Sequence, residues 1–309
     1  MRIGIVGSGA LGSVVGCLLL EAGMDVVMIE RDQEEVRLVQ EKGLLIEGVS
    51  GKRTARPSMW ANPASAGKVD LAILLVKSYD TARAVATLKQ IVSDDGVVLT
   101  LQNGIGNYET LEEAFPGRVL LGTTTMGAMS LGPAAVRHTG FGDTHLGEAD
   151  GSIRERTKAV GEALESMNGG PVHVVDNAVG CVWSKLIVNA AINAPATLLR
   201  VRNGDLPATE AGRSLIHDIV EECVAIARAR GIRLVFENPE ERVVAVCQGT
   251  APNVNSMFQD ILARRRTEID FINGAIAREG DAVGILATVN KTLTNLIKAL
   301  EISDVARIA

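Results

Sequence analysis

Hydrophobic runs and amphipathic segments alternate over the first hundred residues of the 309-residue chain. Short runs rich in Val, Ile and Leu predict buried strands, and segments with apolar residues at helical spacing lie between them. Strands that are apolar on both faces and are separated by helices are typical of a parallel sheet covered on both sides. The predicted strands are 2–6, 25–30, 71–76 and 96–101, and the predicted helices are 10–22, 33–41 and 79–92.

The pattern then changes to long helical periods. An irregular hairpin is predicted at 44–56, turning at Gly48 and Gly51, and β-branched alternation nearly ends after Asp176. Further strands are predicted at 119–124, 134–138, 144–147 and 172–175, and further helices at 152–167, 180–199, 209–230, 239–248, 256–266, 267–279 and 286–302. We therefore expect a doubly wound α/β domain over 1–175 and an all-helical domain over 176–309, which agrees with roughly 150 residues per domain.

The first strand is followed by Gly7-Ser8-Gly9-Ala10-Leu11-Gly12, a G-x-G-x-x-G sequence that opens an apolar helix. In this position Gly7 permits a tight turn, Gly9 lets the backbone approach a pyrophosphate, and Gly12 lets the helix pack on the strand. The helix N-terminus offers unpaired N–H groups to the phosphates. The segment predicts a Rossmann dinucleotide-binding turn.

The end of the second strand gives two indications of the dinucleotide's identity. Glu30 favours NAD, because an acid about 20 residues past the glycines bonds the ribose 2′-hydroxyl, whereas Arg31 favours the 2′-phosphate of NADP. Neighbouring residues on a strand point to opposite sides, so only one of them dominates. The residues alone leave NADP and NAD open.

The predicted helix 180–199 carries a polar stripe. Lys185, Asn189 and Asn193 are spaced i, i+4, i+8 and share one face of an otherwise apolar helix. Buried polar groups are costly unless they have partners. We interpret the stripe as a general acid, Lys185, beside amides that orient a polar substrate. The alternative is a hydrogen-bond network between domains or an exposed face.

Other candidate residues lie where strands end or helices begin. Lys77 and Asn103 follow apolar strands, and such loops line the ligand crevice of an open α/β sheet, although both also suit surface turns. Asn255 and Ser256 suit a helix N-cap. Glu268 suits either a site carboxylate or an ordinary acid in the first turn of a helix.

Composition narrows the class of protein. The net charge of −6 and the content of 5 Phe, 2 Tyr and 2 Trp argue against a nucleic-acid binder. The four cysteines show no metal-ligand spacing, so we predict no metal site and buried free thiols in a reducing cytoplasm. The N-terminal apolar run is broken by glycines, and we expect neither a signal peptide nor a membrane span.

Taken together, these residues resemble the ketopantoate reductase (2-dehydropantoate 2-reductase) family over nearly the whole chain. The resemblance rests on the glycine turn, the Lys77 loop, Asn103-Gly104, Gly122-Thr123-Thr124-Thr125, Trp183-x-Lys185-Leu186 with Asn189 and Asn193, Asn203-Gly204, Ser256-Met257-x-Gln259-Asp260 and Arg266-Thr267-Glu268-Ile269-Asp270. It implies a Rossmann domain, a helical C-terminal domain and NAD(P)H-dependent reduction of ketopantoate to pantoate in pantothenate biosynthesis.

The resemblance also implies roles for individual residues. Lys185 is similar to the family's general acid, and Glu268 to a residue near the nicotinamide and the substrate hydroxyl. The implied substrate-binding residues are Asn103, Asn189, Asn193, Asn203 and Ser256. The implied cofactor-binding residues are Gly7, Ser8, Gly9, Ala10, Leu11, Gly12, Arg31, Lys77, Asn103, Ala128 and Glu268. Glu30, a further cofactor-binding candidate at the end of the second strand, departs from the family's pattern. NADP(H) is favoured, with NAD(H) an alternative because of Glu30.

Two other functions remain open at this point. One is an NAD-linked 2-hydroxyacid dehydrogenase of the same family that acts on another branched or aromatic 2-keto acid. The other is a non-catalytic dinucleotide sensor, which gives no reason for Lys185, Asn189, Asn193 and Glu268 to coexist. The expected partner is a small keto acid, and the apolar helix 286–302 either docks within the chain or forms a homodimer contact.

Overall fold

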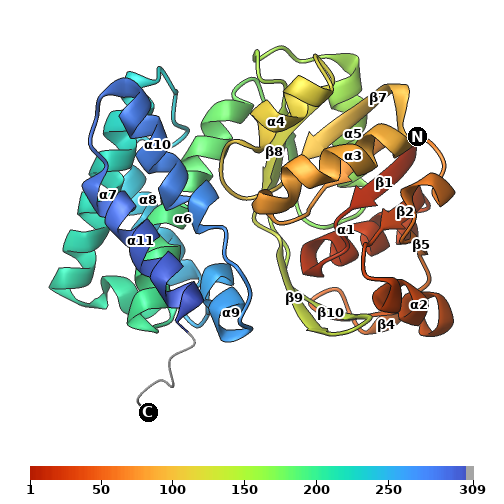
Figure 1. Ribbon diagram of the computed structural model, residues 1–309, viewed down its shortest axis with the longest axis horizontal. Helices are drawn as coiled ribbons and strands as arrows, with labels where there is room; N and C mark the ends of the chain where they lie inside the picture. The colour runs from red at the N-terminus through yellow and green to blue at the C-terminus, as the bar shows by residue number, and fades with distance from the viewer. Residues whose placement is uncertain (304–309) are drawn as a thin grey trace. The chain divides into compact units, whose positions relative to one another are not determined.

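The computed structural model describes residues 1–303, which form two compact units (Figure 1). The first unit contains Met1–Gln102 and Asn107–Ala178, and the second contains Asn103–Gly106 and the chain from Val179 onward. The predicted division between 175 and 176 did not anticipate that the short segment Asn103–Gly106 packs with the second unit. The last six residues of the predicted helical domain, 304–309, lie outside the described residues.

The first unit is built on an eight-stranded sheet. Its strands are β1 Arg2–Val6, β2 Asp25–Ile29, β5 Ser58–Trp60, β6 Val69–Leu74, β7 Val92–Thr100, β8 Val119–Thr124, β11 Thr144–Gly147 and β12 Val172–Val174. Their order is β12-β11-β8-β7-β6-β1-β2-β5, and every neighbouring pair is parallel except β8 with β11. This confirms the predicted α/β fold class. The chain changes direction across the sheet at β1, which is where such folds bind ligands.

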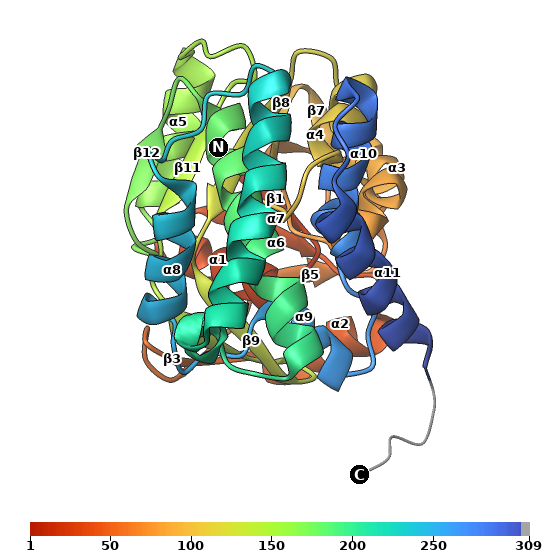
Figure 2. The ribbon, with the colours of Figure 1, turned by 90° about the vertical axis from the view of Figure 1, so that its left-hand side faces the viewer.

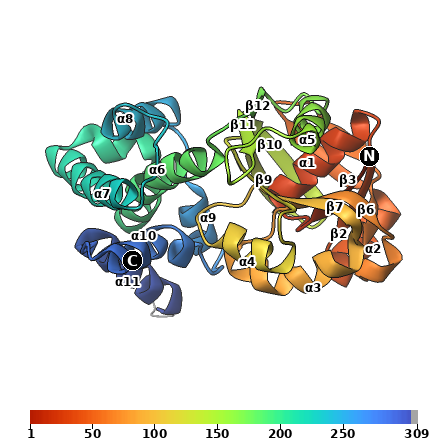
Figure 3. The same cartoon turned by 90° about the horizontal axis from the view of Figure 1, so that it is seen from above.

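Alternate residues of the strands bury opposite faces of this sheet. Ile3 and Ile5 pack in one cluster with α1 (Ala10–Glu21), α2 (Gln33–Lys42) and α5 (Glu155–Glu165). Val6 packs in another cluster with α3 (Thr81–Ile91) and α4 (Asn107–Ala114). Figure 3 shows α1 and α5 on one side of the sheet and α3 and α4 on the other. Both faces are therefore covered, as the continuous apolar runs predicted.

A second, four-stranded sheet packs against α1 in the order β4-β3-β10-β9. Its strands are β3 Leu44–Gly48, β4 Arg53–Ala55, β9 Gly127–Gly132 and β10 Ala135–Gly140. The antiparallel pairing of β3 with β4 confirms the predicted hairpin. Strands β5 and β9 and helix α4 were not predicted. The sequence of β9 gives little signal, because this strand is largely exposed and its residues do not alternate.

The second unit is helical, as predicted. It contains α6 Ala178–Leu199, α7 Glu210–Ala229, α8 Pro239–Gly249, α9 Ser256–Leu262, α10 Asn273–Val283 and α11 Thr288–Ile302, with 3-10 turns at Asn203–Ala208 and Ile269–Phe271. Leu186, Ile187 and Ala190 of α6 are buried in one core with Ile219 and Cys223 of α7. Figure 2 shows α7 in front of α6, with α8 on one side and α10 and α11 on the other.

The predicted helix 267–279 is wrong at its start. Thr267 donates from its N–H and its hydroxyl to Glu301 Oε1 at 2.7 and 2.6 Å, and the Phe271 carbonyl accepts from Ile105 N at 3.1 Å. A continuous helix would pair the Phe271 carbonyl with the N–H four residues later, but here that carbonyl accepts from Ile105, and α10 begins only at Asn273. The predicted helix 256–266 also ends early, at Leu262, and Arg264 has a positive φ of 54°.

Three of the four cysteines are buried free thiols as expected, but Cys181, in the first turn of α6, is only partly buried. Among residues 1–303, no helix combines the length and the apolar character needed to cross a membrane.

Candidate functional site

The glycine-rich turn connects β1 to α1. Gly7 has a φ of 100°, and a Cβ there would overlap the Val76 backbone, so only glycine fits. A Cβ on Gly12 would overlap the Gly7 carbonyl oxygen. A Cβ on Gly9, in contrast, would meet nothing within 4 Å. Helix α1 begins at Ala10, and no side chain of the described residues caps it. Open space before uncapped N–H groups fits a pyrophosphate.

The turn is fixed by hydroxyl groups. Ser8 Oγ donates to the Ile29 carbonyl at 3.3 Å, and Ser13 Oγ donates to the Ser8 carbonyl at 2.9 Å. Ala10 and Leu11, the first residues of α1, are half-buried. These bonds join the turn to the end of β2, where the two residues that bear on dinucleotide identity lie.

Glu30 and Arg31 are both engaged by neighbouring groups. Glu30 Oε1 accepts from Asp32 N at 3.1 Å, and Asp32 in turn caps α2. The exposed Arg31 pairs with Asp80, with 3.2 Å between Nη1 and Oδ2. Both predicted residues therefore follow the end of β2 that is bonded to the glycine turn, and Arg31 is already paired with a carboxylate there.

A buried polar network supports the loop that carries Lys77. Gln102 Nε2 donates to the Val76 carbonyl at 2.8 Å and to Thr81 Oγ1 at 2.9 Å, and Thr81 donates to Asn107 Oδ1 at 2.7 Å. Lys77 itself is half-buried, before the 3-10 turn Ser78–Asp80. Thr81 and Asn107 were missed as supporting residues, because single polar residues at helix starts give no pattern.

Ala128, the remaining predicted cofactor residue, lies half-buried on β9 in the second sheet of the first unit. It packs against the apolar cluster that covers the α1 side of the main sheet and is paired with His138 of β10.

Lys185, Asn103 and Glu268 form one hydrogen-bonded chain in the second unit. Lys185 Nζ donates to Asn103 Oδ1 at 3.0 Å, and Asn103 Nδ2 donates to Glu268 Oε2 at 3.2 Å. Glu268 is buried, with 6% of its surface exposed. Burial lowers the pKa of the Lys185 ammonium to about 8, and the negative charge of Glu268 partly opposes that shift. The arrangement can hold and deliver a proton near neutral pH.

Backbone and side-chain bonds hold these three residues in place. Gly104 has a φ of 80°, and a Cβ there would overlap the Phe271 carbonyl oxygen, so this close approach requires glycine. On the other side, Asn273 Nδ2 donates to the Ala190 carbonyl of α6 at 3.1 Å and to Asn290 Oδ1 at 3.0 Å. The α6 stripe and the Glu268 segment are thereby joined through buried amides.

The other predicted substrate residues lie further along α6 and beyond it. Asn189 is half-buried and Asn193 is 7% exposed. Thr197 Oγ1 donates to the Asn193 carbonyl at 2.6 Å and lies 3.4 Å from Oδ1 of Asn255, the N-cap of α9. Asn255 is thus a cap, as its sequence position suggested, and Ser256 is the exposed first residue of that helix.

Asn203 begins a 3-10 turn close to the same cap. Its Nδ2 donates to Thr250 Oγ1 at 2.9 Å, and its N–H donates to the Asn253 carbonyl at 3.0 Å. Asn203 is thus bonded to the segment that leads to the α9 cap, and Thr197 links the end of α6 to the same cap, whereas Lys185, Asn103 and Glu268 form a separate hydrogen-bonded chain.

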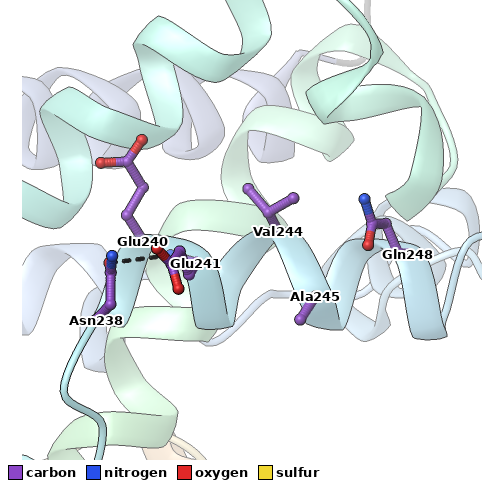
Figure 4. Close-up of a pocket in the computed structure, with 6 residues that line it drawn as sticks. All are labelled: Asn238, Glu240, Glu241, Val244, Ala245 and Gln248. Atoms are coloured by element: carbon purple, nitrogen blue, oxygen red, sulfur yellow. Dashed lines mark hydrogen bonds between the residues drawn. The ribbon is translucent and has the colours of Figure 1, made fainter.

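A hollow of about 370 Å³ lies elsewhere on the second unit, over α8. Its lining residues are Asn238, Glu240, Glu241, Val244, Ala245 and Gln248 (Figure 4). All six belong to α8 or to its cap, and none is a predicted site residue. We regard this hollow as the open surface of one helix.

A Rossmann-type sheet with an open glycine turn, followed by a helical unit that holds a half-buried lysine beside a buried carboxylate, places the protein among the Rossmann-fold oxidoreductases. The chain belongs to the ketopantoate reductase family. The family model described as Ketopantoate reductase PanE/ApbA matches residues 3–151, and the model of its C-terminal part matches residues 177–301. The resemblance drawn from the sequence is confirmed.

Individual relatives cover almost the whole chain. The 2-dehydropantoate 2-reductase of Pyrococcus horikoshii is 39% identical over 97% of this chain and 98% of its own. The crystal structure of 2-dehydropantoate 2-reductase from Geobacter metallireducens is 26% identical, with a TM-score of 0.91 over 97% of this chain and 99% of that one. A D-mandelate dehydrogenase structure with NADH and anilino(oxo)acetate is 29% identical, with a TM-score of 0.90 over 97% and 98%.

Proposed function

We propose that this protein is a 2-dehydropantoate 2-reductase, which reduces the C2 ketone of ketopantoate to the alcohol of pantoate. The observation that carries the proposal is the hydrogen-bonded chain of Lys185, Asn103 and Glu268, in a member of the ketopantoate reductase family. An ammonium whose pKa is lowered towards 8 is suited to stabilise a developing alkoxide and then to protonate it.

We assign the binding of a nicotinamide dinucleotide to the first unit. The turn from Gly7 to Gly12 would hold the pyrophosphate, with Arg31 and Lys77 beside it, and Ala128 is a further cofactor-binding candidate. Reduced nicotinamide, when bound, supplies the hydride for C2. NADP(H) is the favoured form because Arg31 is exposed, and NAD(H) is the alternative because Glu30 adjoins it.

In the second unit, the chain's own groups then handle the substrate and the proton. Lys185 hydrogen-bonds the ketone oxygen and donates the proton that completes the alcohol. Asn103 holds the Lys185 side chain, and Glu268 orients the ammonium or the new hydroxyl. Asn189, Asn193, Asn203 and Ser256 are the candidates for binding the carboxylate and the distal hydroxyl of the keto acid.

The test is nicotinamide absorbance with ketopantoate and each reduced cofactor, run beside a panel of branched and aromatic 2-keto acids. We expect the highest kcat/KM with ketopantoate. Higher kcat/KM for an aromatic 2-keto acid would favour the second candidate, a 2-hydroxyacid dehydrogenase, which the similarity to the D-mandelate dehydrogenase structure supports. Cofactor binding with no oxidation by any keto acid would favour a dinucleotide sensor.

A further inference from the structure

Arg31 and Asp80 form an ion pair that spans the end of β1. Arg31 follows β2, and Asp80 ends the 3-10 turn that follows β6. In the sheet, β1 lies between β2 and β6, and the glycine turn leaves β1 at this same edge. The 3.2 Å contact between Nη1 and Oδ2 therefore joins the two loops that flank the predicted pyrophosphate site.

Among the described residues, the pair with Arg31 is the contact that the structure shows for the Asp80 carboxylate. Asp80 precedes α3, yet its side chain makes no capping hydrogen bond to that helix. The Asp80 side chain is 24% exposed, and the Arg31 side chain is 63% exposed. The neighbouring acids are differently engaged, since Glu30 accepts from Asp32 N and Asp32 caps α2.

The ion pair matters for how Arg31 meets a dinucleotide. A 2′-phosphate carries about −1.5 to −2 charges near neutral pH and takes its strongest hydrogen bonds from a guanidinium. A carboxylate already bound to that guanidinium competes with the phosphate and also repels it. A ribose 2′-hydroxyl carries no charge, so a dinucleotide without the phosphate leaves the ion pair intact.

We infer that Asp80 is a specificity-determining residue for the dinucleotide, because it competes with the 2′-phosphate for Arg31 and so lowers the preference for NADPH over NADH. The inference rests on the proposed assignment of Arg31 to cofactor binding. It does not depend on which keto acid is reduced.

The test uses the full chain with the variant Asp80→Asn, which removes the charge and keeps the shape of the side chain. Dissociation constants for NADPH and NADH are measured from the fluorescence of the reduced nicotinamide, with no keto acid present. We expect the Kd for NADPH to fall by about two- to fivefold, the range for a largely exposed charge pair, while the Kd for NADH hardly changes. Asp95→Asn is the matched control, because Asp95 is exposed near the amino end of β7, at the opposite edge of the sheet.

A second pair of variants tests whether Asp80 acts through Arg31. In an Arg31→Ala background, Asp80→Asn should change the ratio of the two dissociation constants much less than it does in the wild type. An unchanged ratio in Asp80→Asn, an equal change in Asp95→Asn, or no binding of either dinucleotide would overturn the inference. If the protein failed to reduce ketopantoate, the proposed function would be refuted. The dissociation constants for NADPH and NADH would still decide whether Asp80 affects dinucleotide specificity.

Discussion

The Lys185 ammonium donates to Oδ1 of Asn103 at 3.0 Å, although 82 residues separate the two along the chain. The Nδ2 of the same amide donates to the Glu268 carboxylate. Turning the amide over would place its NH₂ group against the ammonium and its oxygen against the carboxylate. The two charges therefore fix the orientation of Asn103, and Asn103 in turn fixes the position of the lysine.

Removal of the Lys185 ammonium should abolish most of the chemistry while leaving the fold intact. Lys185→Ala is expected to lower kcat by about 10²- to 10⁴-fold, the range for losing a general acid that also stabilises developing charge. Steady-state kinetics with ketopantoate measures this loss, and dinucleotide binding should persist. Lys291→Ala, which removes an exposed lysine of α11, is the matched control. Near-normal turnover in Lys185→Ala would exclude the assigned role.

The reduction should slow as pH rises through about 8. Protonated Lys185 is the form that donates, and burial lowers the pKa of this ammonium from 10.5 to about 8, so the active fraction falls above that pH. Glu268 opposes the shift, so Glu268→Gln should move the falling limb of the kcat/KM profile to lower pH. A falling limb centred near 10.5 in the wild type would contradict the lowered pKa of Lys185. A limb that does not move in Glu268→Gln would contradict the effect of Glu268 on that pKa.

Gly9→Ala should separate cofactor binding from folding. Gly9 has an ordinary negative φ of −66°, and a methyl group there meets no protein atom within 4 Å. Thermal or urea unfolding should therefore match the wild type. Dinucleotide affinity should fall by about tenfold or more, because the methyl group occupies the space assigned to the pyrophosphate. Unchanged affinity, measured by fluorescence titration, would count against a pyrophosphate at this turn.

Gly104→Ala tests the close approach of the Asn103 loop to Phe271. The new methyl group would overlap the Phe271 carbonyl oxygen, in a backbone conformation that disfavours alanine. We expect a loss of about 1 to 3 kcal/mol in the free energy of unfolding and a lower kcat as Asn103 shifts. Gly106→Ala is the control for backbone strain alone, since Gly106 has a φ of 99° and its methyl group meets nothing within 4 Å. If both variants lost the same unfolding free energy and the same kcat, the close contact between Gly104 and Phe271 would not be the cause.

Periodic features of the molecule could be predicted from the sequence. Apolar runs of strand length predicted β1 and β2, because strands in a sheet covered on both faces are apolar on both sides. The spacing of Lys185 and Asn189 placed them on one face of α6, since helical geometry alone decides that relation. The glycine turn was recognisable because Gly7 and Gly12 lie where the local backbone leaves no room for a Cβ.

Contacts between distant segments could not be predicted in this way. Asn103 and Glu268 are 165 residues apart, and no periodicity relates them. Another distant contact explains the wrong helix at 267–279, because the Ile105 N–H donates to the Phe271 carbonyl, which a helix would pair with the N–H four residues later. Family resemblance, rather than spacing, placed Asn103 and Glu268 in one site.

The short segment Asn103–Gly106 limits where the gene of this protein can recombine with the gene of a relative and still encode intact units. Within the described residues, the chain passes from one unit to the other at 102/103, 106/107 and 178/179, so a genetic crossover near residue 178 does not exchange intact modules. A chimera joined there would bring a foreign loop against the native Phe271 and Glu268. The two halves of the gene are therefore expected to diverge together at these contacts, and a successful hybrid would have to carry its own 103–106 loop with its helical half.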